Sequence, residues 1–254
     1  MELYLQWSEL MTEGVHIPFW QEFYVKFYQA FIEANRWQQY LQGAGRTLMV
    51  TALALIIGVV LGIIVAIVRS VHDQQRPGRE NVILGIANGI CKIYVTVIRG
   101  TPMLVQMLIM GFVIFSSSRS YTAIGILTLG INSGAYVAEI IRGGLMSLDP
   151  GQAEAGRSLG LTYTDTMRFI VIPQAFKAIL PSLGNEFITL LKDTALIYTI
   201  GGKELLYAAQ AIATRTYEQM FPLVGSALIY LALVMVFTWL QGILERRLRQ
   251  SDRR

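Results

Sequence analysis

The sequence predicts an all-α integral membrane protein with about five transmembrane helices. Of its 254 residues, 54% are hydrophobic and 15% are charged, whereas soluble domains carry about 25% charged residues. Two stretches contain no charged residue at all, 48–68 and 221–244. Each is long enough to cross a hydrocarbon core, which takes about 20 apolar residues. A buried core helix of a soluble protein is the alternative for each stretch, and two such stretches in one short chain make it the weaker one.

The residues before the first span, 1–44, are rich in aromatic side chains. Five of them recur at steps of three and four residues, which places them on one face of a helix: Trp20, Phe23, Tyr24, Phe27 and Phe31. An aromatic face of this kind favours a helix that lies at the membrane interface, and a partly ordered arm is the alternative. We therefore expect 1–44 to be an extracytoplasmic or interfacial segment ahead of a transmembrane domain at 45–245.

The spans after the first one are less regular. The stretch 82–98 is apolar but contains Asn88, Lys92 and Tyr94, and Pro102 disfavours helix at the residue before it. We therefore expect a surface helix or a bent extension before Gly100, and a second crossing that starts near that residue. The other three spans are predicted at 121–141, 178–200 and 221–244.

The distribution of basic residues predicts the orientation. If the amino terminus is outside and the carboxy terminus is cytoplasmic, 14 basic residues fall on the cytoplasmic side and six fall outside, while Lys192 lies within a span. Cytoplasmic loops carry an excess of Lys and Arg, so we expect this topology in a bacterial plasma (inner) membrane, with 246–254 as a basic cytoplasmic tail. The cytoplasmic group is Arg69, Arg76, Arg79, Lys92, Arg99, Arg142, Arg157, Arg168, Lys177, Arg246, Arg247, Arg249, Arg253 and Arg254.

Several other classes of function find no support in the sequence. The net charge of +4 comes from residues that flank apolar segments, so it indicates topology and lipid contact and not a nucleic-acid partner. The stretch 201–204 lacks the upstream glycine and the following hydroxyl of a phosphate-binding loop. Two histidines and one cysteine are too few for a metal cluster. We therefore expect a chain without enzymatic activity, metal or cofactor of its own.

The loop at 151–173 carries the most informative motif. It contains Glu154-Ala155-Gly156, then Gly160, and ends with Ile-Val-Ile at 170–172 followed by Pro173. This resembles the Glu-Ala-Ala motif of the permeases of binding-protein-dependent ABC importers, with glycine in place of the second alanine and isoleucine in place of a leucine. We expect a helix at 152–159 with Glu154 in its first turn, where the helix dipole favours a carboxylate. Gly160 is expected to end it with a positive φ; a generic helix–glycine–helix loop is the alternative.

Three further stretches resemble the polar amino acid permeases within that family: Arg-Gly-Thr-Pro at 99–102, 133–144 and 185–194. The resemblance implies a type I ABC importer permease (MetI-like) fold with a cytoplasmic coupling loop at 150–175. It implies a pore made of two permease subunits, identical or paralogous, an extracytoplasmic substrate-binding protein and an ATP-binding cassette ATPase dimer, which uses ATP and Mg²⁺. The residues it assigns to ATPase coupling are Glu154, Ala155, Gly156, Leu159, Gly160 and Pro173.

Polar residues inside the spans are the candidates for substrate binding, because ionisable groups in a membrane are costly unless they are paired or line water. Two helical stripes are expected to face one cavity. One is on the third span and the other on the fourth, and together they comprise Asn132, Tyr136, Asn185, Glu186, Thr189 and Asp193. A structural ion pair between Glu139 and Arg142 and hydrogen bonding across helices are the alternatives to a site on these spans.

The sequence also contains three GxxxG patterns, which begin at Gly58, Gly85 and Gly130. Small residues at this spacing allow helices to approach closely, so we expect internal packing or an interface between permeases. The leading functional prediction is the pore-forming subunit of an ATP-driven amino acid importer. The alternatives are an ion-coupled secondary transporter, which predicts paired internal repeats, and a membrane scaffold without transport.

Overall fold

The computed structural model describes residues 2–75 and 81–251, and every regular element in these two ranges is helical. Arg76 and Arg79 of the expected cytoplasmic group, and Arg253 and Arg254 of the tail, lie outside the described residues. The α-helices are α1 (Glu2–Thr12), α2 (Phe19–Phe31), α3 (Trp37–Asp73), α4 (Val82–Gly100), α5 (Met103–Ile109), α6 (Tyr121–Met146), α7 (Pro150–Ser158), α8 (Tyr163–Thr166), α9 (Ile172–Asp193), α10 (Leu205–Thr216) and α11 (Met220–Ser251).

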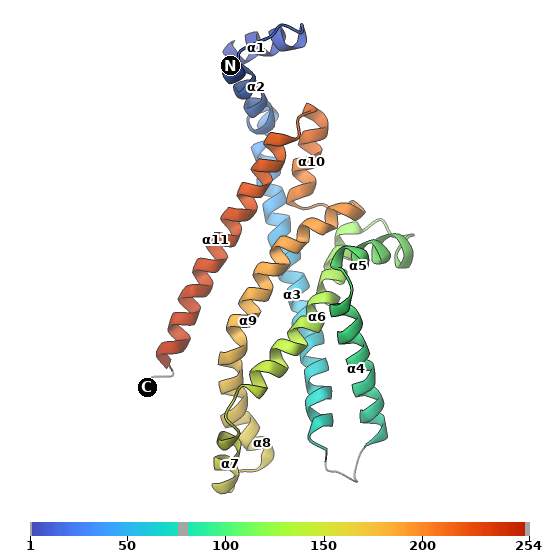
Figure 1. The fold of residues 1–254 in the computed structure, drawn as a ribbon, viewed down its shortest axis with the longest axis vertical. Helices are drawn as coiled ribbons and strands as arrows, with labels where there is room; N and C mark the ends of the chain where they lie inside the picture. Colours follow the sequence, from blue (N-terminus) through green and yellow to red (C-terminus); the bar gives the residue numbers. More distant parts are fainter. Residues whose placement is uncertain (1, 76–80, 252–254) are drawn as a thin grey trace.

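The long helices run along the long axis of the molecule (Figure 1). Helices α3, α4, α6, α9 and α11 form this bundle, with α7 and α8 at one end and α1, α2 and α10 at the other. In the described part of the chain, four helices are long and apolar enough to cross a membrane: α3, α4, α6 and the Met220–Leu248 part of α11. The prediction of an all-α membrane protein with about five spans is confirmed, with α9 as the further long element.

Helix α9 corresponds to the expected span at 178–200, although it is less apolar than the others. It carries Lys177, Glu186, Lys192 and Asp193 along its length, and a 3-10 segment, Thr194–Ile200, continues it. Because of these charges, α9 is not among the four helices that are apolar enough to cross a membrane by composition alone. Its charged side chains are expected to face other protein groups or water and not only lipid.

The second crossing differs from the prediction. The long apolar helix is α4, Val82–Gly100, and the chain breaks after it at Thr101 and Pro102. The part after the break is short, because α5 and a π-helical segment, Met110–Ile114, reach only to residue 114. The prediction that the second crossing starts near Gly100 is therefore wrong. Pro102 disfavours a helical conformation at Thr101, so it marks the end of a crossing helix and not the start of one.

The core of the bundle is the contact between α3 and α6, where small residues let the two backbones meet. A Cβ atom placed on Gly62 would lie 2.5 Å from Cγ1 of Val137, and one placed on Gly130 would lie 2.7 Å from Cβ of Ile57. The GxxxG patterns of α3 and α6 therefore serve internal packing. The pattern on α4 does not, since Gly85 has no neighbouring atom within 4 Å.

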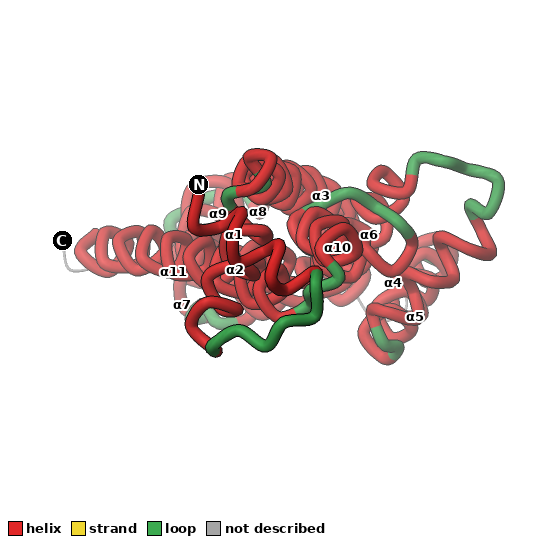
Figure 2. Tube along the Cα trace, turned by 90° about the horizontal axis from the view of Figure 1, so that it is seen from above, coloured by secondary structure: helices red, strands yellow, loops and turns green. Residues whose placement is uncertain are grey.

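The amino-terminal helices overlie the end of the bundle opposite α7 and α8, next to α10 and α11 (Figure 2). Helix α2 is attached through aromatic and ionic contacts: the rings of Phe23 and Phe221 are 4.9 Å apart, and Lys26 lies 3.2 Å from Glu218. The aromatic residues thus do not all share one free face, because Phe23 packs against α11 while Trp20 remains 76% exposed. An interfacial position of this segment remains a prediction.

Candidate functional site

The loop between α6 and α9 is a compact, capped unit. The carboxylate of Asp149 accepts a hydrogen bond of 2.8 Å from the backbone nitrogen of Gly151 and so caps α7, with Pro150 at the first helical position. Both features stabilise a helix start. The expected helix at 152–159 therefore begins two residues earlier, at Pro150. Consequently, Glu154 lies beyond the first turn, and Asp149 supplies the negative charge near the positive end of the dipole.

Gly160 ends α7 as expected. Its φ is +81°, and the backbone nitrogen of Leu161 donates to the carbonyl of Gly156 at 3.1 Å. This is a left-handed helix end, for which glycine is the usual residue. The chain then turns into α8, whose start is capped by the hydroxyl of Thr162, which accepts from the backbone nitrogen of Asp165 at 3.2 Å.

A close contact explains why glycine stands at 156, where the motif has alanine. A Cβ atom at this position would lie 2.9 Å from Cδ1 of Ile170 and 3.0 Å from Cγ2 of Thr166. Helix α7 therefore packs directly on the segment that leads into α9. The other predicted coupling residues lie on the surface of this unit: Leu159 is 82% exposed, and Glu154, Ala155, Gly160 and Pro173 are exposed as well.

The polar stripe predicted on α9 faces two different neighbours. Ser133 Oγ of α6 donates to Glu186 Oε1 at 2.7 Å, whereas Gln241 Nε2 of α11 donates to Asn185 Oδ1 at 3.0 Å. Thr189 is exposed, and Asp193 is the last residue of the helix. Glu186 is thus held between α9 and α6, and Asn185 joins α9 to α11.

The polar stripe predicted on α6 faces the break between α4 and α5. Asn132 Nδ2 donates to Gln106 Oε1 at 2.9 Å, and Gln106 Nε2 donates to the carbonyl of Ile98 at 2.8 Å. The guanidinium of Arg99 lies 5.3 Å from the centre of the Tyr136 ring, within the range of a cation–π contact. The expected single cavity shared by both stripes is therefore not seen in the contacts of the described residues.

An ionic cluster joins α3, α4 and α6 near this break. Glu139 of α6 forms ion pairs with Arg142 at 3.1 Å, with Arg99 of α4 at 3.9 Å and with Arg69 of α3. The predicted pair between Glu139 and Arg142 is confirmed, and sequence reasoning missed Arg69. The signal that could have found Arg69 is its position as the first charged residue after the uncharged stretch 48–68.

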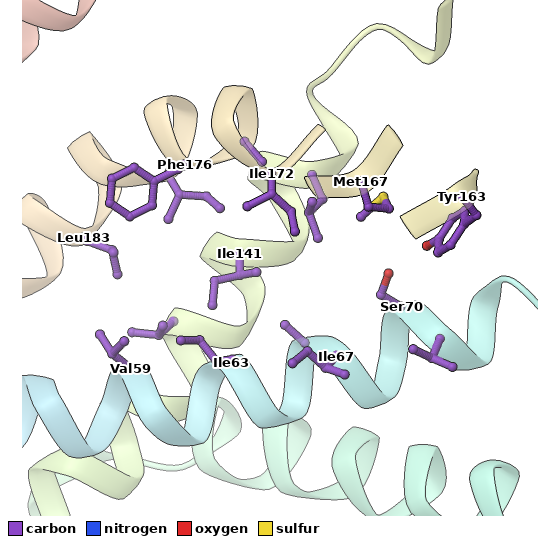
Figure 3. Close-up of a pocket in the computed structure, with 16 residues that line it drawn as sticks. Val59, Ile63, Ile67, Ser70, Ile141, Tyr163, Met167, Ile172, Phe176 and Leu183 are labelled. Atoms are coloured by element: carbon purple, nitrogen blue, oxygen red, sulfur yellow. The ribbon is translucent and has the colours of Figure 1, made fainter. Parts of the chain in front are cut away.

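Two cavities flank α3. A polar one of about 370 Å³ is lined by residues of α3, α4 and α6, namely Arg69, Lys92, Val95, Thr96, Arg99 and Glu139. An apolar one of about 380 Å³ lies between α3, α6 and the α8–α9 region. Figure 3 shows Ile63 and Ile67 of α3 facing Phe176 and Ile172 of α9 across this apolar cavity.

A buried carboxylate at the end of the bundle that holds α10 is a further group that the sequence did not indicate. Glu204 is buried and caps α10, since its carboxylate accepts from the backbone nitrogens of Leu206 and Tyr207, both at 2.7 Å. It also accepts a hydrogen bond from Tyr230 of α11. Because all these bonds are within the fold, Glu204 is an anchoring group between α10 and α11.

Comparison with known proteins places these features in a family context. The family model of the binding-protein-dependent transport system inner membrane component matches residues 81–250. The arginine transport system permease protein ArtQ of Bacillus subtilis (strain 168) is 35% identical over 217 residues, covering 84% of this chain and 93% of that protein. The glutamine transport system permease protein GlnP of Escherichia coli (strain K12) is 35% identical over 214 residues, covering 82% and 92%.

The similar solved structures are also chains of ABC transporters. A chain in a crystal structure of an amino acid ABC transporter with histidines is 40% identical, with a TM-score of 0.74, and the match covers 83% of this chain and 94% of that one. A chain of the inward-facing methionine ABC transporter MetNI is 19% identical, with a TM-score of 0.70 over 85% of this chain and 99% of that one. The second likeness concerns the fold alone.

Proposed function

Since this chain belongs to the family of binding-protein-dependent transport system inner membrane components and is a permease component of an amino acid ABC transporter, we propose that it forms half of the pore of an ATP-driven importer. In this proposal a second permease subunit, identical or paralogous, completes the pore. An extracytoplasmic binding protein delivers the amino acid. A separate ATPase dimer binds ATP and Mg²⁺ and drives transport.

The observation that carries this proposal is the shape of the loop at 150–175. Helix α7 is capped at both ends and packs through Gly156 on the segment that becomes α9. Leu159 stands almost free at its tip. A rigid knob with an exposed apolar side chain is suited to insertion in a groove of a partner protein. We assign Glu154, Ala155, Leu159, Gly160 and Pro173 to its contact surface and Gly156 to its internal packing.

Charge supports an orientation with the carboxy terminus and the loop in the cytoplasm and the amino terminus outside. Helices α7 and α8 and the carboxy-terminal end of α11 all lie towards the same end of the bundle (Figure 1). Lys92 and Arg99 belong to the α4 crossing and no longer count as loop residues, which leaves 12 of the 14 cytoplasmic basic residues against six outside. The bias towards the cytoplasmic side thus persists, as expected for a bacterial inner-membrane permease.

We propose that the transported amino acid passes the polar groups of α6 and α9, namely Asn132, Tyr136, Asn185, Glu186, Thr189 and Asp193. Glu186→Gln and Asp193→Asn keep the shape of each side chain and remove its charge. Both are expected to reduce uptake by about tenfold, the size of one lost charge-assisted hydrogen bond, while ATP hydrolysis is retained. Unchanged transport kinetics in both variants would remove these two carboxylates from the path.

Purification of the complex tests the assignment of the loop. The tagged wild-type chain, expressed together with the neighbouring transporter subunits, should retain a nucleotide-hydrolysing partner in stoichiometric amount. Leu159→Asp places a charge on the exposed tip and should release that partner. Leu3→Asp is the matched control, because Leu3 is also exposed but lies on α1 at the opposite end of the molecule. A wild-type complex without such a partner contradicts the proposed function, and retention by Leu159→Asp contradicts the role of the loop.

A further inference from the structure

The apolar cavity of about 380 Å³ is a groove, open along one side, with a lining that is almost entirely hydrocarbon. Of the 16 residues that line it in the described part of the chain, only Ser70 and Tyr163 carry a polar group. Both lie at the same end of the groove, opposite Val59 and Leu183 (Figure 3). At that end the hydroxyl of Tyr163 donates to Oε1 of Gln74, so α8 is joined there to the end of α3.

The groove has a buried floor and exposed rims. Ala66, Val137 and Ala175 line it and are buried. Ile67 of α3 and Phe176 of α9 line it from opposite sides, and both are more than half exposed. An apolar molecule that enters between the rims is therefore enclosed by α3, α6 and α9.

One rim of the groove is continuous with an exposed apolar stripe along α3, which is long and apolar enough to cross a membrane. Contacts between helices within membranes are enriched in small residues, whereas this stripe consists of large aliphatic side chains. It therefore favours lipid as its neighbour. The stripe recurs at steps of three and four residues: Leu53, Ile56, Val60, Ile64 and Ile67.

The length of the groove matches one leaflet of a bilayer. It follows α3 from Val59 to Val71, twelve residues that correspond to about 18 Å of helix. One leaflet contributes about 15 Å to a hydrocarbon core of about 30 Å. Val59 lies in the middle of the uncharged stretch 48–68, and Val71 lies beyond its end. The groove therefore runs from the centre of the bilayer to the surface on the side of α7 and α8.

The width of the groove distinguishes between possible occupants. A volume of about 380 Å³ over about 18 Å of helix gives a mean cross-section of about 20 Å², or about 5 Å across. A single hydrocarbon chain has about this width, because its carbon atoms approach their neighbours to about 4 Å. An α-helix of a partner subunit is about 10–12 Å across and does not fit.

We propose that one acyl chain of a phospholipid from this leaflet occupies the groove, with its methyl end near Val59. The headgroup then lies at the membrane surface, where Ser70 and Tyr163 provide hydroxyl groups at the depth of the ester and phosphate oxygens. The proposal goes beyond the proposed function, since this lipid is a structural component and not a transported solute. The chain fills the space between α9 and the pair of α3 and α6, and it stabilises their spacing.

Mass spectrometry tests whether the site holds lipid. The tagged chain, with the subunits that remain bound to it, is exchanged into detergent without added lipid, and the wild type should retain one phospholipid per copy of this chain. Ala66→Leu and Ala175→Leu extend into the groove from α3 and from α9. Each should lower the retained lipid by about tenfold or more, because it displaces about two methylene groups. Ala52→Leu is the matched control, since Ala52 is exposed on α3 outside the groove, and it should retain lipid as the wild type does.

Thermal unfolding separates loss of the lipid from misfolding. Complete delipidation should lower the unfolding midpoint of the wild type and of Ala52→Leu by about 5–10 °C, the shift expected on loss of a ligand present at about 100 times its dissociation constant. Vesicles of phosphatidylethanolamine and phosphatidylglycerol should restore it. Ala66→Leu should show less than half of this shift, because its own side chain fills part of the groove.

The same preparations provide the results that would overturn the proposal. These are a wild type without retained phospholipid, full retention in both Ala66→Leu and Ala175→Leu, or an equal response to delipidation in the wild type and Ala66→Leu. A photoreactive benzoylphenylalanine in place of Ile67 should form an adduct with phospholipid in the vesicles, and a crosslink to a second protein chain instead would show that protein covers the groove. None of these measurements requires transport. Absence of an ATPase partner or of ATP-dependent uptake therefore refutes the proposed function alone.

Discussion

Replacement of Glu139 by glutamine should destabilise the contacts between α3, α4 and α6 by about 3 kcal/mol, close to the lower limit for breaking a buried ion pair by removal of one partner. The side chains of Glu139 and Arg69 are 20% and 16% exposed, so their pair is mostly shielded from water. Arg142 is 39% exposed, and its ion pair is therefore expected to contribute only about 0.5 kcal/mol. Most of the loss comes from Arg69, which keeps its charge without a counterion.

Thermal unfolding of the purified complex measures this effect. For a chain of this size, 1 kcal/mol corresponds to about 2–4 °C in the unfolding midpoint, so Glu139→Gln should lower the midpoint by about 6–12 °C on the same scale. The double variant Glu139→Gln with Arg69→Gln should be less destabilised than the single variant, because it leaves no unpaired arginine in the cluster. Glu13→Gln serves as the control, since Glu13 is exposed on the amino-terminal segment.

Two results would refute this reasoning. A midpoint of Glu139→Gln within about 1 °C of the wild type would mean that water already screens the cluster, as it does at most exposed pairs. A double variant less stable than Glu139→Gln would mean that Arg69 is stabilised by other groups and not by this carboxylate.

Two further predictions concern glycines. Gly62→Leu should destabilise the protein by about 3 kcal/mol through overpacking against α6, because a Cβ atom there lies 2.5 Å from a side-chain atom. Gly45→Leu on the same helix meets open space and should be tolerated. Equal expression and equal melting temperatures of the two variants would contradict this packing. Gly160→Val should strain the end of α7 by about 2 kcal/mol, since a β-branched residue is unfavourable at a φ of +81°. The strained loop opens more often, so trypsin should cleave after Arg157 about thirtyfold faster than in the wild type or in Gly143→Val, and an unchanged rate would show that the loop does not depend on this turn.

Sequence reasoning located the spans whose apolar runs are unbroken and misplaced the one that is interrupted. Because of Asn88, Lys92 and Tyr94, the sequence of 82–98 predicts a surface helix or a bent extension of the next span. In the structure, the hydroxyl of Tyr94 donates to the carbonyl of Ile131 at 2.6 Å, Asn88 is buried, and Lys92 lines the polar cavity. Tyr94 and Lys92 thus have places provided by another helix or a cavity, whereas Asn88 is enclosed by neighbouring residues and its Oδ1 has no hydrogen-bond partner in the described part of the chain. No property of the local sequence reveals such partners, so a polar residue was counted against a span that tertiary contacts make possible.

In the candidate site, too, local features were predictable from the sequence and contacts between helices were not. The helix and turn of the loop at 150–175 follow from local signals, since capping residues and a glycine turn act within a few positions of each other, and α7 begins only two residues before the predicted start. The grouping of polar side chains depends on helix rotation instead. Asn132 meets Gln106 of α5, and Glu186 meets Ser133 of α6. A stripe at helical spacing shows which residues share a face, but not which neighbour that face contacts.

The contacts of the loop indicate where force from a partner would enter the bundle. Helix α7 packs on residues 166–170, and this segment continues into α9 without a break in the helix. Nε2 of Gln174 in α9 donates to the carbonyl of Ile170 at 3.1 Å and to Oε1 of Gln152 in α7 at 3.3 Å. Displacement of α7 therefore reaches α9 first.

The pair of α3 and α6 is locked by glycines and by the pairing of Arg69 with Glu139, so it resists the same displacement. The seam between α9 and this pair contains the apolar cavity of about 380 Å³. Packed protein interiors otherwise leave little space for such movement. This cavity is open on one side, so α9 packs less closely on α3 and α6 than these two helices pack on each other, and the hydrogen bond from Ser133 to Glu186 crosses the same seam. A gate driven by the loop is therefore expected at the contact between α9 and α6, not between α3 and α6.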